Sequence, residues 1–447
     1  MSAPFENSVL EAFHRAALRV PAYRVLLGEA GIDPEAIQTA ADFSRLPVLE
    51  KRTTFRRFAI NELCLDGQLG QLGSVLTSSG HSGFFAYGLT GAEAGPAATA
   101  WIDDLLDQMF QVRTQPTLLI NCLPMGVKVP TAACTLAETS VRPDMAVGLV
   151  LAFARHFSQI IFVGEAAFMK QVLELGHRVG TDWHSLRVHL ILGEETLAEN
   201  ARKYLEGLLG IVNGHPDHGV VISSMGVAEL GLNLFSEAPP RGTLVRLRRQ
   251  LHEDPALRRA VLGPCDWVPS LFTYDPRRIF VEFDATGRLI LTALDPRARV
   301  PLIRYATGDQ GRELLLRPTL RPALEAAGMD WGELESLPIV AIHGRGDHAL
   351  AGTKPVYPEA VKEGLYHDPA LAELTTANFR LVSGAVSAHA RIQLAPGVKP
   401  SSQMDERFLE AIRHYVRQPL EVFCLNYATF RSGMTLDYER KFQYLER

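Results

Sequence analysis

Four short apolar runs determine the fold expected for this chain: TLLIN at 117–121, QIIFV at 159–163, VHLIL at 188–192 and VVIS at 220–223. Helical patterns lie between or beside them, at 142–156, 166–178 and 196–209. Apolar strands that alternate with helices favour a largely parallel sheet with both faces covered. We therefore expect an α/β fold in the first half of the chain.

The pattern changes after Pro239-Pro240. The runs IFVEF (279–283) and RLILT (288–292), with turn residues between them, are typical of antiparallel strands. We expect them to form a small barrel-like β region beside the mixed or parallel sheets. A second change near residue 344 begins a shorter strand–helix alternation. The sequence thus predicts an N-terminal core over 1–343, a hinge at 344–347 and a smaller α+β domain over 348–447.

Composition excludes several classes of protein. The chain has 447 residues, of which 47% are hydrophobic, and a formal net charge of −5, which argues against nucleic-acid binding by bulk charge. The most apolar stretch, 145–154, is about half the length of a membrane-spanning helix. The N-terminus does not read as a signal peptide, and the five cysteines are scattered, which fits a reducing compartment. We therefore expect a cytoplasmic protein without a membrane or nucleic-acid partner.

Two polar stretches suit the binding of phosphates and metal ions. In TSSGHSG (77–83), two glycines permit tight turns, and hydroxyls with successive N–H groups can surround a phosphate. In SMGVAE (224–229), Glu229 follows the apolar run 220–223, at the end of a strand where parallel sheets bind ligands. Mg²⁺ prefers one or two such carboxylates together with phosphate oxygens. Each stretch alone also suits an ordinary surface loop.

Three further stretches complete the set. Asp309 ends IRYATGD (303–309), and a carboxylate after a glycine turn can accept hydrogen bonds from the two vicinal hydroxyls of a ribose. HGRGD (343–347) is a basic joint with two glycines. Lys441 lies in DYERKF near the C-terminus. Taken singly, these also read as a strand end, a plain linker and an exposed lysine.

In this order, the five stretches resemble the adenylate-forming superfamily of acyl-CoA synthetases, luciferases and adenylation domains, and most of all its phenylacetate–CoA ligase branch. The matching segments are 78–83 for the Ser/Gly loop, 193–195 for a Gly-x-Glu segment, 225–229 for the Glu-ending turn, 303–309 for Ile-Arg-Tyr-x-Thr-Gly-Asp and 344–347 for the Gly-Arg-x-Asp hinge. Two flanking segments are similar too: Pro47 with Lys51, and Val356-Tyr357-Pro358.

The chain departs from this pattern at five places, one of which is Phe84-Phe85, where a Pro-Lys pair often follows the loop. His81 stands where the family has Thr, Met225 where an aromatic side chain packs on adenine, and Ala228 where a Ser or Thr hydroxyl meets the α-phosphate. Lys441 lacks the usual preceding glycine.

The resemblance implies the adenylate-forming fold, with a mobile C-terminal domain that swings about the hinge. It also implies that an aromatic or medium-chain carboxylic acid reacts with ATP and Mg²⁺ to give an acyl-adenylate and pyrophosphate. The acyl group then passes to a thiol, for which coenzyme A is the first choice. Two alternatives stay open: an adenylating ligase that loads the phosphopantetheine of a carrier protein or an amine, and a nucleotide-binding homologue that has lost catalysis. Dimers occur in this branch, so a homodimer is also considered.

The resemblance assigns roles residue by residue. Lys441, Glu229 and His81 are implied as catalytic, with Glu229 as the Mg²⁺ ligand. The implied nucleotide-binding residues are Ser78, Ser79, Gly80, Ser82, Gly83, Gly193, Glu194, Glu195, Ser224, Met225, Gly226, Arg304 and Asp309. Arg345 and Asp347 are implied as hinge residues. Met125, Val127 and Leu230 are apolar candidates for the acid pocket.

Overall fold

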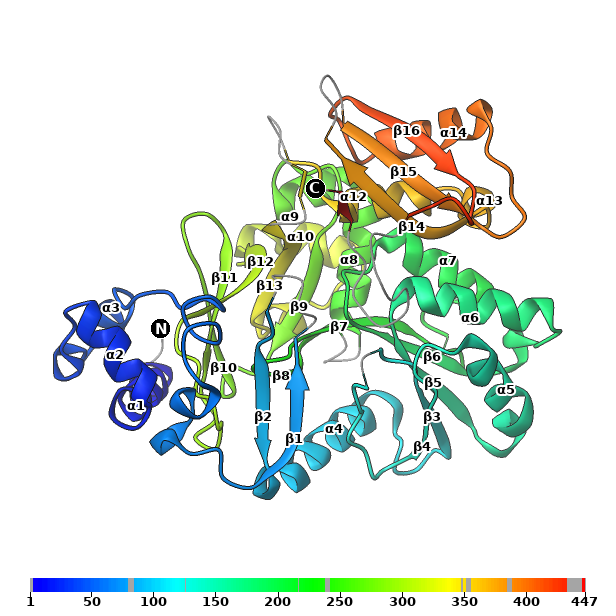
Figure 1. The fold of residues 1–447 in the computed structure, drawn as a ribbon. Coiled ribbons are helices and arrows are strands. Elements are labelled where there is room, and N and C mark those ends of the chain that lie inside the picture. The colour runs from blue at the N-terminus through cyan, green and yellow to red at the C-terminus, as the bar shows by residue number, and fades with distance from the viewer. Residues whose placement is uncertain are drawn as a thin grey trace.

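The computed structural model describes residues 3–78, 84–124, 126–215, 217–237, 242–346, 349–350, 355–383, 388–431 and 444–446. Within these residues the strands form an 11-stranded sheet, a 4-stranded sheet and a two-stranded hairpin (Figure 1). The large sheet has the order β10-β11-β12-β13-β9-β8-β7-β6-β5-β3-β4. No helix in this described part of the chain has the length and apolar character needed to span a bilayer.

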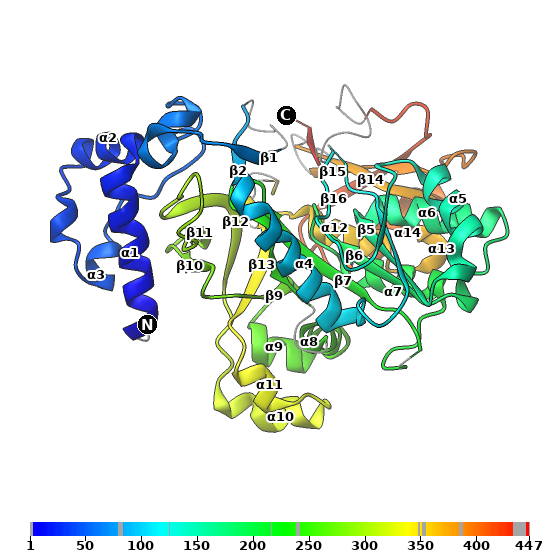
Figure 2. The same cartoon turned by 90° about the horizontal axis from the view of Figure 1, so that it is seen from below.

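One half of the large sheet is parallel, as the apolar runs predict. Its strands are β3 (Thr117–Asn121), β4 (Thr135–Glu138), β5 (Gln159–Gly164), β6 (Val188–Leu192) and β7 (Val221–Val227). One face packs on α5 (Pro143–Phe153), α6 (Ala166–Arg178) and α7 (Glu199–Leu209), and the other on α4 (Gly95–Phe110). Figure 2 shows α4 crossing the sheet. Both faces are covered, which explains why β3 and β5 are buried at every residue.

The other half of the sheet is antiparallel and continuous with the first, so the expected barrel-like region is not a separate sheet among the described residues. Its strands are β8 (Gly231–Ser236), β9 (Ser270–Tyr274), β10 (Ile279–Phe283), β11 (Arg288–Ala293), β12 (Tyr305–Glu313) and β13 (Ile339–Arg345). The helices of this half are α8 (Thr243–Glu253), α9 (Pro255–Leu262), α10 (Arg321–Ala326) and α11 (Trp331–Glu335), which share one apolar cluster.

The N-terminal residues form α1 (Ala3–Arg19), α2 (Pro21–Glu29) and α3 (Ala40–Phe43), which lie beyond β10 and β11 in Figure 1. The hairpin of β1 (Leu72–Thr77) and β2 (Tyr87–Gly91) follows. Short 3₁₀ turns occur at 34–36, 60–63, 65–67, 92–94, 154–156, 183–185 and 318–320.

The C-terminal residues form the small α+β unit that the sequence predicts. Its elements are α12 (Pro358–Leu365), α13 (Pro369–Ala372), β14 (Thr375–Val382), β15 (Ala388–Leu394), α14 (Ser402–Arg413), β16 (Leu420–Leu425) and β17 (Leu445–Glu446). One apolar cluster joins this unit to the core, since it includes Leu173 and Leu205 of α6 and α7 and Val361 and Leu365 of α12. The expected hinge, 344–347, begins at the end of β13, and its movement stays a prediction.

A fully buried cluster of charges joins the parallel half of the sheet to the antiparallel half. Arg202 of α7 contacts Glu199 at 3.0 Å and Glu237, just after β8, at 2.7 Å, while Arg248 of α8 contacts both carboxylates at 3.1 Å. All four side chains are at most 1% exposed. Glu237 also accepts the N–H of Ser223, in β7, at 2.7 Å. The cluster therefore fixes the strand that leads into the Glu229 turn.

Replacement of Glu237 by glutamine should destabilise the fold. The Glu237→Gln variant leaves two buried guanidinium groups to share the charge of Glu199, and breaking a buried pair costs about 3–5 kcal/mol. We expect the urea midpoint of unfolding, followed by circular dichroism, to fall accordingly. The exposed pair of Arg142 and Asp144 offers a control, because an Asp144→Asn variant should unfold at the midpoint of the wild type. Equal midpoints for all three proteins would contradict a structural role for the cluster.

Candidate active site

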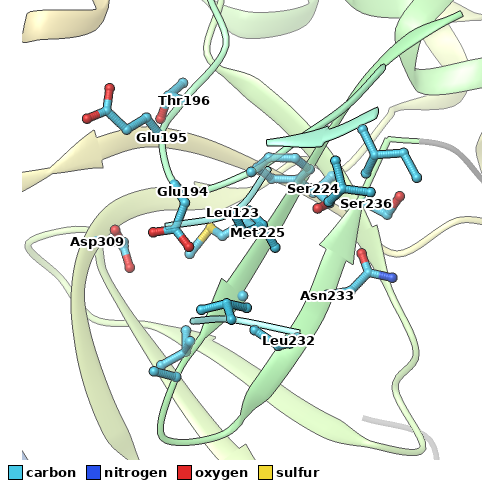
Figure 3. Close-up of a pocket in the computed structure, with 18 of the residues that line it drawn as sticks. Leu123, Glu194, Glu195, Thr196, Ser224, Met225, Leu232, Asn233, Ser236 and Asp309 are labelled. Carbon is cyan, nitrogen blue, oxygen red and sulfur yellow. The ribbon is translucent and has the colours of Figure 1, made fainter. Parts of the chain in front are cut away.

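A cavity of about 260 Å³ lies at the carboxyl ends of β6 and β7, where a parallel sheet offers a binding crevice. The loop after β6, the β7–β8 turn, β12 and β13 line it, and α4 forms an apolar wall. Figure 3 shows Glu194, Glu195, Ser224, Met225 and Asp309 around it. The C-terminal unit adds α12 and Tyr444 to the lining, so segments from most of the chain meet at one place.

The loop after β6 carries the predicted Gly193, Glu194 and Glu195, and all three line the cavity. Gly193 donates its N–H to Gly164 of the adjacent strand at 2.9 Å. Glu194 has φ +69°, a left-handed conformation that a residue with a β-carbon adopts at a cost. In Figure 3 the side chains of Glu194 and Glu195 project in different directions from the loop. One loop thus presents two carboxylates to two regions of the site.

Strand β7 and the turn after it bring the predicted Ser224, Met225, Gly226 and Glu229 to the same cavity. The β1–β2 hairpin packs against this turn so closely that a β-carbon on Gly88 would lie 1.9 Å from the carbonyl oxygen of Ala228. Gly88 therefore permits the contact that anchors the hairpin.

The same hairpin presents the first residue of the predicted phosphate loop. Ser78 lines the cavity, and its hydroxyl accepts the N–H of Ala86 at 2.9 Å. The rest of that loop, Ser79, Gly80, His81, Ser82 and Gly83, lies outside the described residues.

Glu229 is buried and already has two partners. Lys51 Nζ lies 3.2 Å from its Oε1 atom, and the Tyr305 hydroxyl donates to the same oxygen at 2.8 Å. Burial, and then the charge of Glu229, raises the pKa of Tyr305, so its hydroxyl stays protonated and donates. Among the described residues no group of three or more His, Cys, Asp or Glu side chains could hold a metal ion. In this arrangement one carboxylate oxygen of Glu229 is taken up by Lys51 and Tyr305, and the metal role of Glu229 stays a prediction.

Asp309 and Arg345 lie opposite each other, because β12 and β13 pair with these two residues in register. The Arg345 guanidinium is 3.9 Å from the Asp309 carboxylate and donates to the carbonyl of Thr307 at 2.9 Å. Gly308 has φ +89°, and a β-carbon there would lie 3.0 Å from the guanidinium. The backbone conformation at this position therefore favours glycine, and the guanidinium packs directly against it. The sheet register explains how two motifs 36 positions apart in sequence form one wall.

Arg304 does not line the cavity. Its guanidinium donates to the carbonyl oxygens of Ser44 and Leu46 and contacts Glu282 at 3.2 Å. Its own carbonyl accepts the N–H of Leu49 at 2.8 Å. It therefore fastens to β12 the segment that carries Lys51.

The remaining predicted residues divide into three groups. Val127 lines the cavity beside an aliphatic wall that includes Ile102, Leu105, Leu106 and Met109 of α4. Of the predicted residues that the structure describes, Arg304 and Leu230 do not line it; Leu230 packs among the apolar residues around Val227. Met125, Asp347 and Lys441 lie outside the described residues.

Four lining or supporting residues had no assigned role in the sequence prediction: Lys51, Tyr305, Glu359 and Lys362. A signal existed for Lys51, four residues after Pro47, and for Tyr305 inside its motif. Glu359 and Lys362 are three residues apart in a helix and so lie on one face, but the sequence alone does not show what that face meets.

Comparison with known proteins gives matches in structure only. No protein-family model and no curated protein matches the sequence. The chain is similar to a 2-hydroxyisobutyryl-CoA ligase in its postadenylation state, with a TM-score of 0.71 and 12% identity over 99% of this chain and 88% of the ligase. For the same ligase in its thioesterification state the TM-score is 0.55, with 13% identity over 98% and 90% of the two chains.

A benzoate-CoA ligase from Burkholderia xenovorans LB400 has a TM-score of 0.52 and 11% identity over 84% of this chain and 68% of the ligase. The chain therefore has the fold of the adenylate-forming CoA ligases.

Proposed function

We propose that this protein activates a carboxylic acid with ATP and transfers the acyl group to a thiol, with coenzyme A as the first candidate. The observation that carries the proposal is the convergence of Glu194, Glu229, Asp309 and Arg345 on one cavity with an aliphatic wall. A nucleotide needs polar and charged contacts, whereas an organic acid needs an apolar chamber, and this cavity offers both.

The polar side suits a nucleotide. We assign the ribose hydroxyls to Asp309, whose carboxylate can accept their hydrogen bonds, and the segments 193–195 and 224–226 line the same cavity. We assign the phosphates to the loop that begins at Ser78. Mg²⁺ would accompany ATP through the phosphate oxygens, whose charge it neutralises.

The apolar side suits the acid. The wall formed by α4 and Val127 is aliphatic, and we propose an aromatic or medium-chain acid as the substrate. A carboxylate oxygen attacks the α-phosphorus of ATP, the bond from that phosphorus to the bridging oxygen breaks, and pyrophosphate leaves. An anion approaches a polyanion in this step, so cations and N–H groups must stabilise the charge. Lys441 is the proposed donor to the reacting oxygens.

In the second step the thiol sulfur attacks the acyl carbon, the carbon–oxygen bond to AMP breaks, and the thiol proton passes to solvent. We propose that the C-terminal unit turns about residues 344–347 between the two steps. The similarity to a postadenylation complex supports the view that the present arrangement belongs to the first step. A homodimer and a cytoplasmic location stay predictions.

Pyrophosphate release with a panel of carboxylic acids tests the proposal. Release with one or more acids supports adenylation, and faster AMP release with coenzyme A than with a phosphopantetheinylated carrier protein or an amine supports the thiol ligase. Faster release with a carrier protein or amine would favour that alternative, for which the cavity contains no distinguishing feature. If AMP binds but no acid reacts, the protein is a nucleotide-binding homologue without catalysis.

Removal of the Asp309 carboxylate should weaken ATP binding. Hydrogen bonds to a charged group contribute about 1.5–3 kcal/mol, so we expect the Asp309→Ala variant to bind ATP roughly 10- to 100-fold more weakly in calorimetry. The exposed Asp217, 86% accessible at its side chain, provides an Asp217→Ala control with unchanged affinity. Melting curves establish that both variants are folded. Unchanged affinity in the Asp309 variant would contradict the ribose assignment.

Removal of Lys441 should separate the two chemical steps. Loss of one charge-stabilising donor typically lowers the rate about 10²- to 10³-fold, and we expect this loss in pyrophosphate exchange by the Lys441→Ala variant. Thiolysis of a supplied acyl-adenylate should be spared. Lys399→Ala, at an exposed position in the same C-terminal unit, is the control. Equal loss in both steps would refute this division of roles.

A further inference from the structure

Helix α12 inserts charged residues into the contact between the C-terminal unit and the core. All eight residues of the helix, Pro358 to Leu365, are buried, and three of them are Glu359, Lys362 and Glu363. Charged groups are rarely buried without partners because the loss of hydration is costly. Their partners therefore show what the docked helix recognises in the core.

Glu363 caps the N-terminus of α7. Its carboxylate accepts the N–H groups of Glu199 and Asn200, in the first turn of α7, at 2.8 and 2.9 Å. This contact lies outside the lining of the cavity. It anchors the C-terminal unit, and it suits the helix dipole, but it does not involve the residues assigned to the nucleotide.

Lys362 makes a contact of a different kind. Its Nζ atom lies 2.6 Å from Oε2 of Glu195 and 4.6 Å from the ring centre of Tyr444. The Tyr444 hydroxyl donates to the same oxygen of Glu195. Both donors come from the C-terminal unit, and Glu195 belongs to the core loop beside the nucleotide residues. All three residues line the cavity.

Lys362 also balances other negative charges at this contact. Glu359, one turn earlier in α12, is 8% exposed, and its Oε2 atom has no hydrogen-bond partner among the described residues. Burial raises the pKa of Glu359 to about 7, and likewise the pKa of Glu165, where the charge of Glu195 adds to the effect. Burial alone would lower the pKa of Lys362, but Glu195 and Glu359 outweigh it and raise that pKa. The lysine therefore keeps its charge while docked.

The end of β13 packs against Glu359 of the same helix. Gly344 has φ +127°, and a β-carbon there would lie 2.6 Å from a carboxylate oxygen of Glu359. Docked α12 thus sits against the first residue of the proposed hinge. A rotation about that hinge would carry α12 away and separate Lys362 from Glu195.

We infer that Lys362 is a positioning residue, which forms an interdomain latch with Glu195 and holds the loop 193–196 in place for adenylation only while α12 is docked. This inference rests on the proposed function for its catalytic consequence, although the latch itself is a property of the structure. Lys362 acts through Glu195, so it should govern the rate of the first step more than the affinity for ATP, and should matter little for thiolysis.

Separate measurements of adenylation and thiolysis test the predicted effect of Lys362 on the first step. We expect Lys362→Met to lower kcat of pyrophosphate exchange roughly 10- to 100-fold, with a smaller change in KM for ATP, and to spare thiolysis of a supplied acyl-adenylate. Lys362→Arg, which keeps the charge, should restore part of the rate. Lys399→Met, an exposed substitution in the same unit, is the control. Equal loss in both steps, or loss in Lys362→Arg equal to that in Lys362→Met, would overturn the inference.

Hydrogen–deuterium exchange of the ligand-free protein tests the latch without any reaction. We expect Lys362→Met and Glu195→Gln each to speed amide exchange in 193–197 and in α12. The double variant should change exchange by less than the sum of the two single variants, because both remove one interaction. Additive effects, or protection equal to that of the wild type, would overturn the latch. If no acid reacts with the wild-type protein, the proposed function fails, and the exchange result still decides the latch.

Discussion

The central constraint of the structure is a buried cluster of two arginines and two glutamates between the two halves of the large sheet. This cluster positions β7 and the loop after β6, which both line the cavity. Glu237 receives both guanidinium groups and the N–H of Ser223. Arg248 also donates to the carbonyl of Leu197, at the end of the loop that follows β6. Buried charges of this kind contribute little net stability but are costly to leave unpaired. They therefore restrict β7, α7, α8 and the loop to one mutual arrangement.

Two glycines allow close contacts that position further segments of the cavity wall. Gly88 lets the β1–β2 hairpin reach the Glu229 turn, and Gly308 lets the Arg345 guanidinium lie beside β12. A β-carbon would lie 1.9 Å from a backbone oxygen at Gly88 and 3.0 Å from the guanidinium at Gly308. Glycine is thus used where two distant segments must touch, and those contacts position the residues that we assign to ATP.

The sequence predicts the elements well and the side-chain partnerships poorly. Local periodicity is enough to find β3 at 117–121, because a strand buried on both faces is a continuous apolar run. Asp309 could be identified from its motif. The pairs of Lys51 with Glu229 and of Lys362 with Glu195 could not, because their members are more than 160 positions apart and no local rule links them. Arg304 lies in a motif that suggests a ligand contact, yet its guanidinium holds two backbone carbonyls.

The charges at the cavity share one feature that bears on how it would accept ATP. Among the described lining residues, the lysines and arginines are Lys51, Arg345 and Lys362, and each lies within 4.0 Å of a carboxylate on another segment. The described lining is therefore not basic, because these three cations face five carboxylates, those of Glu194, Glu195, Glu229, Asp309 and Glu359, in keeping with the negative net charge of the chain. A bound polyphosphate would compete with Glu229 for Lys51 and with Asp309 for Arg345.

Such competition links binding to conformation. A cation that turns from its carboxylate to a phosphate loosens the contact between the two segments that it had joined, and the freed carboxylate can accept a ribose hydroxyl instead. The Lys362–Glu195 pair differs from these two, because it joins the core to the C-terminal unit and, as inferred above, stays closed during adenylation.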